Sequence, residues 1–130
     1  MADDIPANAT VDAFSGGQRL QVAVKDLRRF ATIETYPGTG ITLRRSMAGG
    51  LIYTTSSSPV TIIAPTTGQF QTGTHISVMQ GGSGQVTFAA MSGVTIRTPE
   101  TLNLAKQYAV ASIIIIGIDE WLLAGYLEAA

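Results

Sequence analysis

Short runs in which hydrophobic and polar residues alternate dominate the chain from about residue 40 onwards. Ile76 and Val78 alternate with polar neighbours, and Val86 and Phe88 do the same one run later. An alternation of period two places every second side chain on one face and is typical of a β-strand with one buried face. The runs recur roughly every ten residues, as in a β-sandwich or barrel. The expected strands are 41–43, 51–55, 60–64, 75–79, 85–89, 94–96, 108–118 and 120–124.

The segments between these runs are rich in glycine, serine and proline, which favour turns. Gly81-Gly82-Ser83-Gly84 is interpreted as a tight hairpin connection. No long amphipathic helix fits the sequence after Ala31. About eight strands in roughly ninety residues predict an all-β fold, an antiparallel β-sandwich or jelly-roll-like domain.

The N-terminal part of the chain has a different pattern. Residues 1–8 contain two acids and a proline without periodicity, and we interpret them as an extended arm. Residues 10–24 predict a hairpin that turns at Ser15-Gly16-Gly17. Asp26 is a candidate N-cap for a short helix that follows it at 27–30.

One alternative stays open for this region, because the spacing of Leu20, Val24, Leu27 and Ala31 also fits a single helix over 20–31. We favour the hairpin, since β-branched residues alternate there after a Gly-Gly pair. The expected organisation is an attachment region over 1–36, with arm, hairpin and short helix, followed by a β-sandwich domain over 37–130.

Charged residues are scarce and unevenly distributed. They make up 13% of the chain, about half the usual share, and the mean hydropathy is +0.27. From Ser46 to Ile96 there is no Asp, Glu, Lys or Arg. A soluble monomer normally uses charge to protect its sheet edges and surface. We therefore expect part of the surface to be buried against neighbouring subunits.

The charge balance and composition argue against several partners. A net charge of −1 gives no concentrated basic face for nucleic acid, although six of the eight basic residues lie in the first third. The longest apolar run, Ala109 to Ile118, is about half the length that crosses a bilayer, and we interpret it as a buried strand. The N-terminus lacks the basic and apolar regions of a signal peptide. There is no cysteine, so disulfides and thiolate metal sites are excluded.

Catalytic residues are hard to assemble from this sequence. His75 is the only histidine, and no acid lies near it in the chain, so a Ser-His-Asp arrangement is unsupported. Asp119 and Glu120 belong to an expected turn, where successive side chains diverge. No spacing predicts a zinc or calcium site, and the glycine-rich segment 81–84 lacks the Gly-Lys-Ser/Thr of a phosphate loop. We expect no enzymatic activity, no cofactor and no metal.

A carbohydrate-binding module is an alternative from a different functional class. Sugar sites usually pair an exposed aromatic ring with acids or amides, whereas Trp121 lies in an apolar run that predicts core packing. Tyr36, Tyr53 and Tyr126 are the remaining candidate contact residues.

Two parts of the sequence contain motifs at spacings that can be compared with a known family. Residues 73–96, with Gln85-Val86-Thr87 and Gly93-Val94-Thr95-Ile96, precede Gln107-Tyr108 and the ending Trp121-Leu122-Leu123-Ala124-Gly125. This order, over about the last sixty residues, is similar to a β domain that recurs in tailed-phage virion proteins. Residues 14–27 are similar to a hairpin followed by Asp-Leu near the start of many phage fibre and head proteins. The resemblance implies a β-sandwich and a homo-oligomer, often a trimer, and transfers no catalytic residue.

The low charge and the resemblance lead to one functional expectation. The chain is expected to be a non-enzymatic structural protein on the outer surface of a phage virion, decorating or stabilising the capsid; a short tail or neck fibre protein is the alternative. The expected partners are copies of the chain itself, with a homotrimer favoured over a dimer, and a major capsid protein or a tail or neck protein. The candidate contacts to such a partner are Asp3, Asp4, Arg28, Arg29, Arg44 and Arg45.

Overall fold

Residues 30–130, the part of the chain that the computed structural model describes, contain nine β-strands and one short 3-10 helix. The strands are β1 (Ile33–Tyr36), β2 (Gly40–Thr42), β3 (Leu51–Thr54), β4 (Val60–Ala64), β5 (His75–Gln80), β6 (Val86–Ala90), β7 (Thr95–Arg97), β8 (Val110–Gly117) and β9 (Glu120–Gly125), and the helix η1 is Arg45–Met47. The predicted arm, hairpin and short helix, together with Asp3, Asp4, Arg28 and Arg29, lie outside the described residues.

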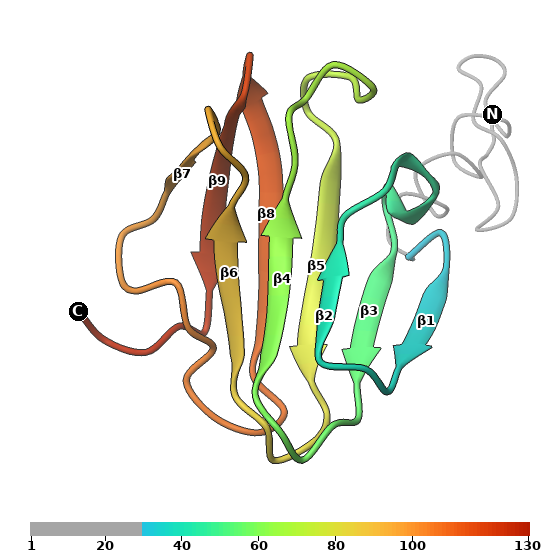
Figure 1. Ribbon diagram of the computed structural model, residues 1–130, viewed down its shortest axis with the longest axis vertical. Helices are drawn as coiled ribbons and strands as arrows, with labels where there is room; N and C mark the ends of the chain where they lie inside the picture. The colour runs from blue at the N-terminus through green and yellow to red at the C-terminus, as the bar shows by residue number, and fades with distance from the viewer. Residues whose placement is uncertain (1–29) are drawn as a thin grey trace, which may run out of the picture. The chain divides into compact units, whose positions relative to one another are not determined.

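The strands form two sheets that enclose a common core (Figure 1). The larger sheet has six strands in the order β1-β3-β5-β8-β9-β7, and the smaller sheet has three in the order β2-β4-β6. From β1 to β6 the chain therefore changes sheet after every strand. This alternation between two facing sheets produces a coiled path in place of a series of hairpins. We call each pair of successive strands a coil: β1 with β2, β3 with β4, and β5 with β6.

Strands of successive coils pair in parallel and in register. β1, β3 and β5 pair in this way in the larger sheet, as do β2, β4 and β6 in the smaller one. Val60 lies beside Val86, and Ile62 lies beside Phe88. Each coil thus stacks its apolar residues on those of the next coil, which is the packing principle of a β-solenoid.

The coiling stops after β6, where the C-terminal part of the chain closes this end. β8 pairs antiparallel with β5 and with β9, and β7 pairs parallel with β9. The edge of β6 is covered by residues 102–104, because the Leu104 N–H donates to the Val86 carbonyl at 2.9 Å and the Phe88 N–H donates to the Leu102 carbonyl at 2.8 Å. Leu104 also bridges to Leu127.

The core lies between the two sheets and is apolar and fully buried. Trp121, Phe88, Ile62 and Ile113 are all 0% exposed. The Trp121 indole N–H donates to the Pro65 carbonyl at 3.0 Å, which satisfies its one polar group. The prediction that Trp121 packs in the core is confirmed.

The all-β fold is confirmed, and every strand expected between residues 41 and 124 is present, with ends that differ by at most two residues. The antiparallel pairing is found only for the two pairs that contain β8; the other five pairs are parallel. The connection at Gly81–Gly84 is accordingly not a hairpin, since it leads from β5 in the larger sheet to β6 in the smaller sheet.

The sequence analysis did not predict β1 or η1. Residues 33–36 form β1 and belong to the larger sheet through β3, within a unit that spans Ala31–Ala130. The predicted boundary between the attachment region and the β-sandwich domain, at residues 36 and 37, falls directly after this strand. Among the described residues, no helix is long and apolar enough to cross a membrane.

Candidate interaction surface

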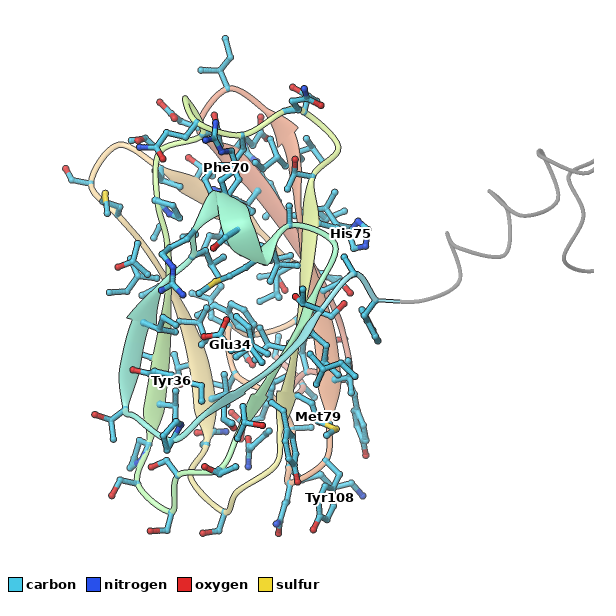
Figure 2. All side chains as sticks on the ribbon, turned by 90° about the vertical axis from the view of Figure 1, so that its right-hand side faces the viewer. Glu34, Tyr36, Phe70, His75, Met79 and Tyr108 are labelled. Atoms are coloured by element: carbon cyan, nitrogen blue, oxygen red, sulfur yellow. The ribbon has the colours of Figure 1, made fainter. Side chains whose placement is uncertain are left out.

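The larger sheet has one face against the core and one face that no described residue covers. Strand alternation decides which side chains lie on each face. In β3, Ile52 and Thr54 point inward and are buried, so Leu51 and Tyr53 point outward and are half-buried. In β5, Ile76 and Val78 point inward, and Met79 points outward. Figure 2 shows His75, Met79 and Tyr108 on the side of the larger sheet away from the core.

We call this side the outer face. The register brings its residues into rows across the strands: Tyr53 lies beside Met79, and Met79 beside Val110. A second row contains Leu51, Ser77 and Ser112, and a third contains His75, Ile114 and Leu122. The apolar members of the outer face are Ile33, Leu51, Tyr53, Met79, Val110, Ile114, Leu122 and Ala124.

Polar groups at the centre of the outer face are already satisfied. The Ser77 and Ser112 hydroxyls hydrogen-bond each other at 2.7 Å. Ser77 is only 3% exposed because its neighbours in the row cover it. The centre of the face therefore offers few hydrogen-bonding groups to a partner and presents mainly hydrocarbon.

Charge on the outer face is confined to its β7–β9 margin, where the Arg97 Nε lies 2.8 Å from a Glu120 carboxylate oxygen. The outer face across β1, β3, β5, β8 and β9, with its polar residues His75, Ser77 and Ser112 included, is about five strands wide and five residues long, on the order of 400 Å² from ordinary strand dimensions. That is the size of the largest apolar patches on monomeric proteins, which are often functional. Sheets with parallel strands are usually covered on both faces.

The outer side of the smaller sheet has a different chemistry. Thr61 lies beside Thr87, and the Thr87 hydroxyl donates to the Asn103 side-chain oxygen at 2.8 Å. Hydroxyl groups suit a surface in contact with water. The next outward row of this sheet contains Thr42, Ile63 and Ala89, so this surface is mixed. The outer face of the larger sheet is mainly apolar by comparison.

A small pocket lies where the β4–β5 loop meets the β8–β9 turn, with a volume of about 410 Å³. Asp119 closes it: its carboxylate accepts the Thr67 N–H at 2.9 Å, and the Asp119 N–H donates to the Thr67 hydroxyl at 2.8 Å. The Phe70 ring lines the pocket and packs edge-on against Trp121, with the ring centres 5.5 Å apart. Both segments were predicted to be turns, and the pocket could not be predicted because the contact joins residues more than fifty positions apart.

The predicted contact arginines within the described residues lie next to the first coil. Arg44 precedes η1, and its guanidinium lies 3.7 Å from the Glu34 carboxylate. Arg45 begins η1 and is exposed. Asp3, Asp4, Arg28 and Arg29, the other predicted contact residues, lie outside the described range.

The residues examined for catalysis and sugar binding are found apart from one another. His75 is exposed on the outer face, and Asp119 and Glu120 diverge as expected, toward Thr67 and Arg97. Within residues 30–130, no three His, Cys, Asp or Glu side chains group as metal ligands. The Tyr36 hydroxyl is bound to the Gly40 peptide, Tyr53 lies on the outer face, and Lys106 lies over the Tyr126 ring at 5.5 Å.

Comparison of the chain with protein-family models, with curated protein sequences and with solved structures gives no match.

Proposed function

We propose that the protein is a non-enzymatic structural protein of a phage virion, which decorates or stabilises the outer surface of the capsid as a homo-oligomer. The observation that carries this proposal is the outer face: an apolar surface, without charge at its centre, on a sheet whose strands are mostly parallel. The resemblance of the last sixty or so residues to a tailed-phage virion domain supplies the biological setting.

The size of the outer face fits a subunit that acts in many copies. The face covers about 400 Å², which at roughly 25 cal/mol per Å² corresponds to at most about 10 kcal/mol of favourable apolar burial. Association costs a similar amount in lost translational and rotational freedom. A single contact through this face is therefore weak, and tight attachment requires several contacts at once, as in an oligomer on a repeating shell.

The first test is the mass of the purified full-length chain in solution by light scattering, compared between the wild type and two lysine variants. Met79→Lys places a charge at the centre of the outer face, and Thr61→Lys places the same charge on the hydroxyl-rich surface of the smaller sheet. We expect an oligomer for the wild type and Thr61→Lys, and a smaller species for Met79→Lys. An equal mass for both variants would show that the outer face does not take part in oligomer formation.

The virion setting needs a separate test. Particles purified on a density gradient from a phage that carries the gene should contain the chain in many copies, as measured by mass spectrometry. Replacing Arg45 by Glu, or deleting residues 1–9 with Asp3 and Asp4, should lower the amount incorporated if these charges contact the capsid. Particles that lack the wild-type chain would refute the assignment to the virion.

A location in a short tail or neck fibre keeps the same surface and changes only the partner. Carbohydrate binding is the second candidate function, and the pocket beside Asp119 and Phe70 is the observation that favours it, since it combines a carboxylate, threonine hydroxyls and an aromatic ring. A glycan-array screen of the wild type and of Thr66→Lys separates the two functions. A glycan bound by the wild type and lost in the variant would support the sugar site.

A further inference from the structure

The two ends of the β-solenoid are protected differently. At the end formed by the last coil, residues 102–104 pair with β6 and bond in turn to the C-terminal segment, where the Glu128 N–H donates to the Asn103 carbonyl at 2.8 Å. The far edge of the larger sheet is β7, a strand of three residues that carries the Arg97–Glu120 ion pair. Short length and charge are common protections of a sheet edge. This end is therefore closed.

At the other end, the edge of the smaller sheet is also protected. The carbonyls of Thr39 and Ile63 accept hydrogen bonds between β2 and β4. The N–H and the carbonyl of Gly40 therefore point away from β4. The Tyr36 hydroxyl donates to the Gly40 carbonyl and accepts the Gly40 N–H at 3.2 Å. A side chain from β1 thus occupies the place that an additional strand would take on β2.

The edge of β1 has no such protection among the described residues. The carbonyls of Thr32 and Tyr36 accept hydrogen bonds from Leu51 and Thr55, on the β3 side. Because peptide groups alternate in direction along a strand, those of Ile33 and Thr35 point away from β3. β1 pairs with β3 only. Ile33, with its side chain 68% exposed, sits at this open edge.

We propose that the β1 edges of two copies of the chain pair antiparallel about a two-fold axis and join their larger sheets into one continuous sheet. This inference rests on the proposed function, because it adds a second contact, beside the outer face, through which the homo-oligomer is built. Identical edges are self-complementary under two-fold symmetry. The pairing also extends the outer face across both copies, so that one dimer presents twice the apolar area to a further partner.

Charge favours a second copy as the occupant of this edge. The edge carries one acid, Glu34, and one base, Arg44, whose side chains are 40% and 55% exposed. These two side chains lie 3.7 Å from each other within one copy, so the edge carries no net charge and two copies do not repel each other there. Pairing Ile33 with Ile33 of the second copy places Glu34 opposite Thr32 of that copy. The two glutamates therefore do not lie directly opposite each other, where they would repel.

The variant pair Thr35→Pro and Thr35→Val tests the pairing in the full-length chain. Proline removes an N–H that points away from β3, so the internal ladder is kept, whereas valine keeps the N–H and a similar shape. Sedimentation velocity over a range of concentrations should show a dimer for the wild type and Thr35→Val. For Thr35→Pro, dimerisation should be at least about tenfold weaker, equivalent to one or two lost hydrogen bonds.

Amide hydrogen exchange provides a second measurement that does not depend on a variant. The Ile33 and Thr35 amides should become protected as the wild-type concentration rises, while the Ile96 amide, which faces away from β9 on the β7 edge, should not change. Protection of Thr35 in the monomer would show that another segment of the same chain covers the edge, and protection only on addition of particles would show a foreign strand. Both results would overturn the proposal.

The failure of this inference can be told apart from the failure of the proposed function. An oligomer that is unchanged in Thr35→Pro, or a trimer without protected Thr35 amides, overturns the edge pairing and leaves assembly through the outer face intact. A wild-type chain that is monomeric at all concentrations and absent from particles overturns the proposed function itself.

Discussion

The corner at Gly81–Gly84 lies directly against the corner of the preceding coil at Ser56–Ser58. The Gly84 N–H donates to the Ser56 carbonyl at 3.0 Å. A Cβ at Gly84 would lie 2.5 Å from the Ser58 carbonyl carbon and 2.9 Å from the Ser56 carbonyl oxygen, and closer still to the Ser58 oxygen. These neighbours are backbone atoms and cannot rotate away as a side chain would. Substitution of Gly84 by alanine must therefore separate the two coils.

The cost of Gly84→Ala follows from these contacts. The hydrogen bond to Ser56 contributes about 1 kcal/mol, and overpacking at a buried site costs about 1–3 kcal/mol more. We expect Gly84→Ala to lower the free energy of unfolding by about 3 kcal/mol. For a unit of about one hundred residues, this corresponds to a fall in Tm of more than about 10 °C.

Gly68 is the matched control, because it is exposed and a Cβ there would meet nothing within 4 Å. Gly68→Ala should be neutral or stabilise by about 0.5 kcal/mol, through the lower entropy of the unfolded chain. Urea unfolding followed by circular dichroism measures both variants. The stacked-corner explanation would be refuted by a Gly84→Ala variant within about 0.5 kcal/mol of the wild type, or by equal losses in the two variants.

Two further predictions concern contacts between distant segments. Trp121→Phe removes the indole N–H and leaves the Pro65 carbonyl without its donor. The free energy of unfolding, measured in urea, should therefore fall by about 1–3 kcal/mol. Asp119 has a φ of +52° and binds Thr67. Asp119→Ala should lower the free energy of unfolding by about 2 kcal/mol. Asp119→Asn should lower it by less than about 0.5 kcal/mol, since asparagine keeps the acceptor and tolerates this φ. The melting temperatures of the two variants should show this order.

Local structure could be predicted from this sequence far better than strand pairing. The alternation at Ile76–Val78 and at Val86–Phe88 fixes where strands lie, and each of these strands is present. Alternation has the same period in parallel and antiparallel sheets, so it cannot say which neighbour a strand takes. The glycine-rich segment 81–84 favoured a hairpin because glycine permits tight turns, whereas here its small size permits two corners to touch.

The strand β1 was missed although Ile33, Thr35 and Tyr36 are good strand formers. Ile33-Glu34-Thr35-Tyr36 is followed by Pro37-Gly38, and this turn-rich context favoured a linker. Its place is determined by β3, on which it stacks in register from Ile33 beside Leu51 to Tyr36 beside Thr54. The local sequence can indicate a strand at 33–36, but it cannot show that this strand pairs with a coil later in the chain.

The outer face had a partial signal in the sequence. The run Ile113-Ile114-Ile115-Ile116 has apolar residues at both odd and even positions, which is typical of a strand buried on both faces. Ile113 and Ile115 are buried in the core, while Ile116 is 45% exposed and Ile114 lies on the outer face. The sequence could therefore show that β8 has two apolar faces, but only the sheet order shows that one of them has no cover among the described residues.

The charge-free stretch from Ser46 to Ile96 has two separable causes in this fold. Parallel stacking in register brings equivalent residues of adjacent coils to about 4.8 Å, so repeated like charges would repel. The smaller sheet satisfies this constraint with hydroxyls at Thr61 and Thr87, beside a second row with Ile63 and Ala89, and so stays partly polar. Stacking thus excludes repeated charge without requiring hydrocarbon. On the larger sheet the same constraint is met with Leu51, Tyr53 and Met79. That choice has no explanation within the isolated chain, and the proposed burial of the outer face against neighbouring subunits accounts for it.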